Sequence, residues 1–155
     1  MKKIFLFILM IFMLVLCIFA EDKQKSATGA GLELNMNSRE NFAVGAVINF
    51  DYKLGSSFAA GINLTASNNF SGIIVIEPAA MFRFYFLGNN HAGWFVQTDA
   101  GAYLVLEDDD LTPMFLGGLR AGLRLPLGSK FFAEPFGRIG YPFVFGVGVL
   151  AGIRF

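Results

Sequence analysis

The sequence offers few side chains for acid–base or nucleophilic chemistry. Its 155 residues include one histidine, His91, and one cysteine, Cys17. A histidine acts as a general base when it lies beside a serine and a third group, such as an aspartate, orients it. His91 sits in a turn-like segment of Gly, Asn and Ala at residues 88–93, where a solvated surface position is the simpler interpretation. The sequence therefore predicts no catalytic triad.

The densest charge in the chain is the acidic run at residues 107–110, one Glu followed by three Asp. Several carboxylate oxygens around one ion could form a weak site for a divalent cation. The run lacks the spacing of an EF-hand loop, and repulsion between like charges makes a solvated loop the simpler interpretation. We expect neither a metal site nor a cofactor site.

Nine other charged residues follow a period of two. Within each segment, charged residues take one parity and large apolar residues the other; Glu77 and Arg83, for example, oppose Ile76 and Phe82. This period places the two sets on opposite faces of a β-strand. Five acids and four bases on the polar face can pair in a confined interior as a charge network: Glu33, Asp51, Glu77, Arg83, Asp99, Arg120, Arg124, Glu134 and Arg138.

Eight strands are predicted to carry these residues, because alternating segments are separated by Gly, Asn, Asp and Ser. Three Leu-Gly turns, at 54–56, 87–89 and 127–129, each lead into a strand that begins with an aromatic residue, and the other connections lack this pattern. Two kinds of strand connection favour an up-and-down antiparallel order. The predicted strands span residues 28–37, 41–52, 57–67, 73–86, 94–107, 113–126, 131–140 and 143–155.

The distribution of charged and aromatic residues decides which face is outside. A soluble barrel has an apolar interior, whereas a membrane barrel turns its apolar face to lipid. An Arg or Lys facing the bilayer midplane costs about 2–4 kcal/mol, whereas the same group in a narrow interior can find a partner. Aromatic residues gather at both ends of the predicted strands, as expected at two membrane interfaces. The sequence predicts an all-β protein, an eight-stranded antiparallel up-and-down transmembrane β-barrel.

Prolines and glycines within the strands carry further expectations. Pro78 and Pro135 each follow a glutamate inside a strand. Because every strand of a closed barrel has two neighbours, we expect a bulge to absorb each missing N–H. Glycines such as Gly31, Gly122 and Gly148 are expected to relieve crowding and curvature in a narrow barrel. The last strand is expected to alternate without interruption, with every second residue from position 143 to 155 on the apolar face.

The first 20 residues are predicted to be a signal peptide. Lys2 and Lys3 precede an apolar run that ends at Ala20, and charged residues follow. A retained membrane helix and lipidation at Cys17 are the alternatives to cleavage after Ala20. Cleavage leaves ten Lys and Arg against twelve Asp and Glu, no thiol for a disulfide and no clustered basic surface for nucleic acid. The predicted organisation is a signal peptide at 1–20, a polar leader at 21–26 and the barrel at 27–155.

In pattern, nearly the whole mature chain resembles the small eight-stranded outer-membrane barrels of the OmpA and OmpX type. The signal segment, the Leu-Gly turns and the terminal alternation carry the resemblance. It implies export, help from periplasmic chaperones and the barrel-assembly machinery of diderm bacteria, and insertion with both termini on the periplasmic side. One departure is the short outer connections, the longest of which is about seven residues, 107–113. The implied insertion signal comprises Tyr141, Phe143, Phe145, Ile153 and Phe155.

Together these features predict a monomeric, non-enzymatic outer-membrane protein that contacts membrane lipids and no nucleic acid, with a structural or surface-interaction role. Eight strands enclose a space that side chains fill, so the charge network should form a paired, dry interior. Two alternatives stay open. One is a narrow channel for small solutes, and the other is a lipid-modifying enzyme, which would need His91 beside a Ser or Asp at a membrane interface.

Overall fold

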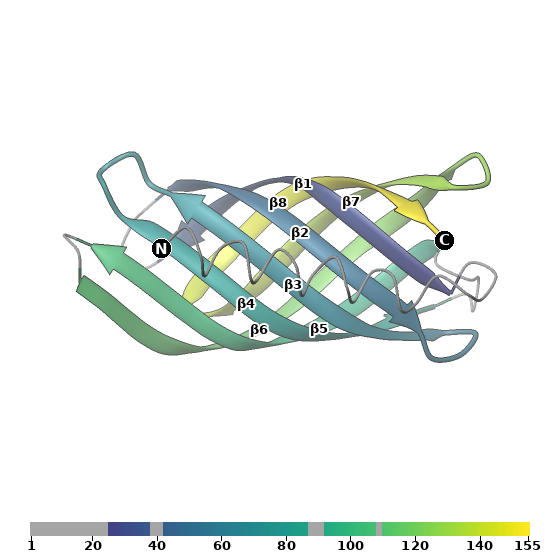
Figure 1. Ribbon diagram of the computed structural model, residues 1–155, viewed down its shortest axis with the longest axis horizontal. Coiled ribbons are helices and arrows are strands. Elements are labelled where there is room, and N and C mark those ends of the chain that lie inside the picture. The colour runs from purple at the N-terminus through teal and green to yellow at the C-terminus, as the bar shows by residue number, and fades with distance from the viewer. Residues whose placement is uncertain (1–24, 38–41, 87–91, 108–109) are drawn as a thin grey trace, which may run out of the picture.

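The computed structural model describes residues 25–37, 42–86, 92–107 and 110–155. All eight predicted strands are present, with ends close to those expected from the alternation (Figure 1). The predicted signal peptide and His91 lie outside the described residues. No helix in the described ranges is long and apolar enough to cross a membrane. The strands are β1 (Ser26–Asn37), β2 (Ala43–Lys53), β3 (Phe58–Asn68), β4 (Ile74–Tyr85), β5 (Gly93–Glu107), β6 (Asp110–Leu127), β7 (Phe131–Tyr141) and β8 (Phe143–Arg154).

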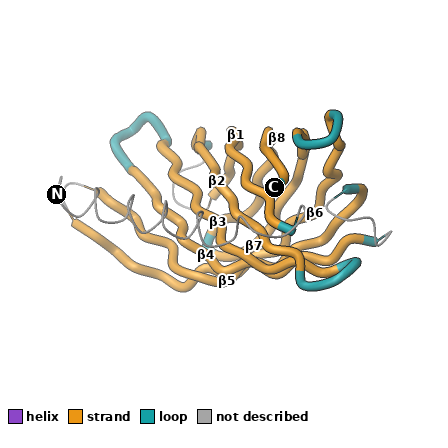
Figure 2. Tube along the Cα trace, turned by 45° about the vertical axis from the view of Figure 1, so that its right-hand side comes forward, coloured by secondary structure: helices purple, strands orange, loops and turns teal. Residues whose placement is uncertain are grey.

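The strands form one closed barrel in sequence order, and every neighbouring pair is antiparallel. β8 pairs with β1, where Ala27 lies opposite Arg154, and this pairing removes the open edges of the sheet. Ser26 and Phe155 complete the closure with two backbone hydrogen bonds of 2.9 Å. The predicted up-and-down antiparallel barrel is confirmed. Figure 2 shows the strands side by side with the connections at their ends.

We call the end of the barrel with the β2–β3, β4–β5 and β6–β7 connections the turn end, and the opposite end the far end. The β5–β6 connection at the far end is shorter than expected. β6 begins at Asp110, which pairs with Glu107, so the predicted seven-residue outer loop is wrong. The ladder continues because Leu104 and Leu106 lie opposite Pro113 and Leu111 and extend the apolar face on both strands. The two ends of the acidic run, Glu107 and Asp110, are thus part of the β5–β6 ladder.

Neither Pro78 nor Pro135 produces a bulge, so that expectation is wrong. In the β4–β5 ladder the pairing stops after Ile76–Leu104 and resumes at Ala79–Gly101 with the same register. The β6–β7 ladder likewise keeps one register across its gap at Pro135. Each proline removes one backbone donor, and the strand simply omits the local ladder pairs instead of inserting a residue.

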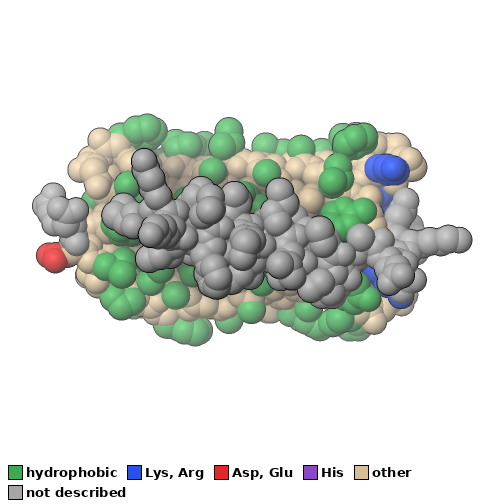
Figure 3. All heavy atoms as spheres, viewed as in Figure 1, with side chains coloured by type: hydrophobic (Ala, Val, Ile, Leu, Met, Phe, Trp, Pro, Cys, Tyr) green, Lys and Arg blue, Asp and Glu red, His purple; other side chains and the backbone are tan. Residues whose placement is uncertain are grey.

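The two faces of the barrel wall have opposite character. Alternate residues point outward and are large and apolar; Leu32 is 63% exposed and Ile62 is 48% exposed. The space-filling view shows such side chains distributed along the length of the wall (Figure 3). The inward residues include fully buried charges, such as Arg83 at 0% exposure. This distribution is the reverse of that in a water-soluble barrel.

The start of β8 interrupts the predicted alternation. The β1–β8 register shifts between Met36 and Asn37, which pair with Phe145 and Phe143. Phe143 is consequently buried inside the barrel, whereas Val144 and Phe145 are both exposed. The predicted outward position of Phe143 is wrong, because a bulge places two consecutive residues on one face. Tyr141, Phe145 and Ile153 are exposed as expected.

Candidate functional site: the charged interior

The nine charged residues with the shared parity all lie inside the barrel, in the space we call the lumen. They come from six strands, and none is more than 7% exposed. Three of the four lumen arginines form close ion pairs with lumen carboxylates. Buried charges are stable only when they are paired and hydrogen-bonded, and the geometry of these pairs meets that condition.

The first group of charges, near the turn end, is the turn-end cluster: Asp51, Arg83, Arg124 and Glu134. Arg83 donates two parallel hydrogen bonds of 2.9 Å to the two carboxylate oxygens of Glu134. Arg124 donates from Nε to Glu134 Oε2 at 2.6 Å and from Nη2 to Asp51 Oδ2 at 2.8 Å. Gln97 Oε1 also accepts from Arg83 Nε at 2.8 Å. Bidentate pairing of this kind fixes orientation as well as charge.

The second group, nearer the far end, is the far-end cluster: Glu33, Asn35, Glu77 and Arg138. Arg138 donates to Glu77 Oε2 at 2.6 Å and to Glu33 Oε1 at 2.7 Å. Its Nη2 also donates to Asn35 Oδ1 at 3.1 Å. Asn35 in turn donates to Glu33 Oε1 at 2.5 Å. One arginine thus holds two carboxylates from different strands.

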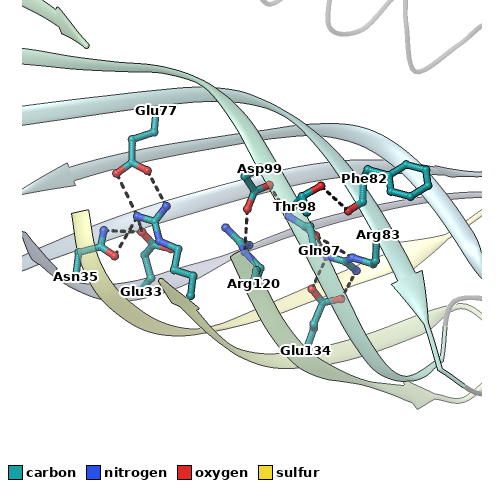
Figure 4. A network of polar contacts seen from close by, with 11 residues as sticks. Glu33, Asn35, Glu77, Phe82, Arg83, Gln97, Thr98, Asp99, Arg120 and Glu134 are labelled. Carbon is teal, nitrogen blue, oxygen red and sulfur yellow. Dashed lines mark hydrogen bonds and ion pairs between the residues drawn. The ribbon is translucent and has the colours of Figure 1, made fainter. Parts of the chain in front are cut away.

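The two clusters connect β4 and β7 twice across the lumen. Arg83 of β4 binds Glu134 of β7, and Arg138 of β7 binds Glu77 of β4. β4 and β7 are not neighbours in the barrel, so no backbone hydrogen bonds join them. The sticks in Figure 4 show the two groups of contacts separated along the barrel. The side chains therefore fasten opposite walls that the ladder alone leaves unconnected.

Each lumen arginine also lies against an inward aromatic ring, which the sequence reasoning missed. The guanidinium carbon of Arg83 is 4.0 Å from the centre of the Phe95 ring, and that of Arg124 is 4.1 Å from Phe132. The corresponding distances are 4.3 Å for Arg120 on Phe136 and 4.0 Å for Arg138 on Phe143. Cation–π contacts stabilise a desolvated guanidinium by about 2 kcal/mol or more. Phe95, Phe132 and Phe136 have the same parity as the lumen charges on their strands, so the sequence could have predicted that they point inward. The inward position of Phe143 could not be predicted, because it depends on the bulge.

Arg120 differs from the other three arginines. Its closest carboxylate oxygen, Asp99 Oδ2, is 3.8 Å from Nε, beyond hydrogen-bond distance. Figure 4 shows Arg120 and Asp99 between the two clusters, joined by this long contact alone. Asp99 accepts a hydrogen bond from Gln97 at 2.6 Å instead. The sequence correctly predicted that Arg120 lies in the lumen. Its expected pairing with a lumen carboxylate is not found as a hydrogen bond.

Apolar side chains complete the filling of the lumen. At the far end, Val75, Tyr103, Val105, Leu116 and Phe143 form a buried cluster. A second buried apolar cluster includes Tyr85, Phe95 and Phe136 beside the turn-end charges. Within the described ranges, no group of three or more His, Cys, Asp or Glu is arranged to hold a metal ion. The arrangement closes the barrel interior, because the charged groups of the two clusters are hydrogen-bonded to one another rather than open to a substrate.

Comparison with known proteins bears on the fold. No family model matches the sequence, and no curated protein matches it. Among solved structures, the N-terminal β-barrel domain of Pseudomonas aeruginosa OprF is similar with a TM-score of 0.61 and 16% identity, over 86% of this chain and 100% of that chain. Neisserial surface protein A (NspA) matches with a TM-score of 0.58 and 13% identity, over 83% of this chain and 94% of that chain. A de novo designed transmembrane β-barrel matches with a TM-score of 0.51 and 12% identity, over 85% and 98% of the two chains. The chain therefore has the fold of the small outer-membrane β-barrels.

Proposed function

We propose that this chain is an integral outer-membrane barrel whose lumen is closed by the charge network, and that it acts as a structural or surface-interaction component without enzymatic activity. The observation that carries the proposal is the reversed distribution of side chains between the two faces. Leu32, Ile62 and Phe115 are exposed on the wall, whereas Arg83, Arg124 and Glu134 are fully buried in the lumen. A protein in water would expose the charges and bury the apolar side chains, so the wall suits a lipid environment.

The orientation in the membrane follows from the positions of the termini. Both ends of the barrel sequence, Ser26 and Phe155, lie at the turn end and are hydrogen-bonded to each other. In this proposal the turn end lies in the periplasm, as the resemblance to small outer-membrane barrels implies. The far end, with the acidic β5–β6 hairpin, would then face outward from the cell. In this proposal Tyr141, Phe145, Ile153 and Phe155 present the insertion signal to the barrel-assembly machinery, with Phe143 excluded from the lipid face.

Closure of the lumen argues for a barrel that does not conduct. The ion pairs of the two clusters and the inward aromatic rings fill the lumen at both levels, and apolar side chains fill it at the far end. Moving a solute through would require breaking buried ion pairs, and loss of one partner of such a pair costs about 3–5 kcal/mol. The narrow-channel alternative therefore receives no support from the described lumen residues.

Planar-bilayer recording tests this closure directly. Purified wild-type protein, shown to be folded by a gel mobility that changes on boiling, should give no discrete conductance steps. A variant with both Arg83→Ala and Glu134→Ala serves as the matched control, because it removes a cross-lumen pair and should increase ion leakage. Reproducible unitary steps from folded wild-type protein would contradict the closed-lumen proposal and favour a narrow channel.

A further inference from the structure

The guanidinium group of Arg120 is buried without a hydrogen-bond acceptor from the protein. Arg120 is 1% exposed, and Nε, Nη1 and Nη2 all lack a partner among the described residues. The Phe136 ring covers one side of the group at 4.3 Å, but a ring face does not satisfy the N–H donors at the edge of the guanidinium plane. A buried unsatisfied donor costs about 1–3 kcal/mol, and more when it is charged.

Other buried side chains also have unsatisfied atoms, among them Glu33 Oε2 and Arg138 Nε of the far-end cluster, and three such side chains lie on the opposite wall. Asn49 has neither Nδ2 nor Oδ1 hydrogen-bonded, and Asn63 Oδ1 and Thr65 Oγ1 also lack partners in the described part of the chain. All three residues are at most 4% exposed. They come from β2 and β3, which lie three to four strands away from β6 around the eight-stranded barrel. Polar atoms on both sides of the lumen thus need partners.

The strand register places these side chains at the level between the two clusters. Asn49 lies opposite Asn63 in the β2–β3 ladder. The next inward residue on β2 is Asp51 of the turn-end cluster. The next inward residue on β3 is Thr65, which lies opposite Glu77 of the far-end cluster. Arg120 occupies the corresponding interval between the clusters (Figure 4). We call Arg120, Asn49, Asn63 and Thr65 the middle layer.

The chemistry of the middle layer selects the ligand. Arg120 and Asn49 Nδ2 offer donors, whereas Asn49 Oδ1 and Asn63 Oδ1 offer acceptors and Thr65 Oγ1 can do either. An anion would satisfy only the donors. It would also add negative charge to a lumen in which five carboxylates already outnumber four guanidinium groups. A cation would satisfy only the acceptors and would be repelled by Arg120. Water both donates and accepts, and buried waters occur where otherwise unsatisfied polar groups converge.

We propose that the middle layer is an internal water-binding site, in which a small cluster of ordered water molecules bridges Arg120 to Asn49, Asn63 and Thr65. The lumen is then closed by ion pairs at its two clusters and hydrated between them. The far-end apolar cluster and the turn-end ion pairs enclose these waters. The site explains how a guanidinium that donates no hydrogen bond to a carboxylate, and whose nearest carboxylate oxygen is 3.8 Å away, stays inside the barrel.

Water-to-protein magnetisation transfer in ¹⁵N-arginine-labelled and ¹⁵N-asparagine-labelled protein tests the proposal. In lipid nanodiscs, rotating-frame spectra should show a dipolar cross peak between water and Arg120 Nε–H and between water and the Asn49 side-chain amide. The matched control is Arg124 Nε–H, which donates to Glu134 at 2.6 Å and should show none. Absence of a water cross peak at Arg120 in folded wild-type protein would overturn the proposal.

A halide titration in the same sample separates water from an anion. Replacing gluconate by chloride, bromide or iodide should leave the Arg120 Nε resonance unchanged if water is the ligand. A saturable shift confined to Arg120 would instead identify an anion site and contradict the proposal. Loss of the signal in Arg120→Met assigns the resonance; if that variant does not fold, through-bond assignment of the wild-type spectrum replaces it.

Discussion

Charged residues in the lumen differ in how completely the protein itself pairs them. Arg83 makes a bidentate pair with Glu134 and further hydrogen bonds to Gln97 and Tyr85. Arg120 lies four positions from Arg124 on the same strand, is equally buried, and has no hydrogen bond to any described protein group. Substituting Arg83 and substituting Arg120 should therefore change the stability by different amounts, although each substitution removes one buried positive charge.

We expect Arg83→Met to lower the free energy of unfolding by about 3–5 kcal/mol, because Glu134 and Asp51 would lose a cation while remaining buried. Arg120→Met should cost clearly less, since no carboxylate loses a hydrogen bond and Met is itself apolar. Urea titration in detergent micelles, followed by the gel-mobility difference between folded and unfolded barrel, measures both. Equal losses for the two variants would contradict the assigned pairing.

For individual residues, the sequence predicted which face of the strand a charged side chain occupies better than which residue it pairs with. Parity along each strand placed all nine charges inside, because a period of two allows only two faces. It could not predict that Arg124 and not Arg120 joins Asp51 to Glu134, since that pairing depends on how strands far apart in sequence are staggered around the barrel. The inward position of Phe143 was missed because one bulge reverses parity for the residues beyond it.

Among the strands, small residues set how closely the backbones approach. A Cβ added to Gly31 of β1 would overlap the Val149 carbonyl oxygen of β8, so this position requires glycine. A Cβ added to Gly137 of β7 would meet only the Gly146 carbonyl oxygen, at 3.9 Å. Both residues are strand glycines with ordinary negative φ. The sequence alone gives no reason to treat them differently.

The matched substitutions Gly31→Ala and Gly137→Ala should consequently shift stability in opposite directions. Gly137→Ala should raise the free energy of unfolding by about 0.4–1 kcal/mol, because it restricts the unfolded chain without a clash. Gly31→Ala should lower the stability or prevent folding, because the β1–β8 closure must open to admit the methyl group. The same urea titration compares them. A stability gain at Gly31 would show that the β1–β8 spacing is not as described, and a marked loss at Gly137 would show the same for the β7–β8 spacing.

Strand existence and order were predictable because hydrophobic alternation and repeated Leu-Gly turns are local signals. The exceptions were features that depend on neighbouring strands. The β5–β6 ladder continues to Glu107 and Asp110 because facing strands extend each other, and the prolines keep the register because adjacent ladder pairs on both sides fix it. The local sequence suggested a loop between β5 and β6 and a bulge at each proline, because it carries no information about the neighbouring strands.

For the molecule as a whole, the barrel wall separates an apolar exterior from a polar interior. Because the eight strands form a closed barrel, the sheet has no unpaired edge strand. A sheet that spans a lipid bilayer must have none. Among the described residues, the charged side chains outside the lumen lie at the ends of the barrel: Lys25, Lys53, Lys130 and Arg154 at the turn end, and Glu107 and Asp110 at the far end. On the face drawn in Figure 3, Lys and Arg side chains lie at one end and an acidic side chain at the other. A bilayer can therefore surround the middle of the wall without contacting a charge.

The most direct test of this account measures which methyl groups contact lipid. In nanodiscs that contain a stearic acid with a nitroxide near its methyl end, we predict strong paramagnetic broadening of the outward methyl groups of Ile48, Ile62 and Leu119. The inward methyl groups of Val47, Leu116 and Leu150 should keep most of their intensity. Equal broadening of both sets, or stronger broadening of the inward set, would contradict the assignment of the apolar face to the membrane.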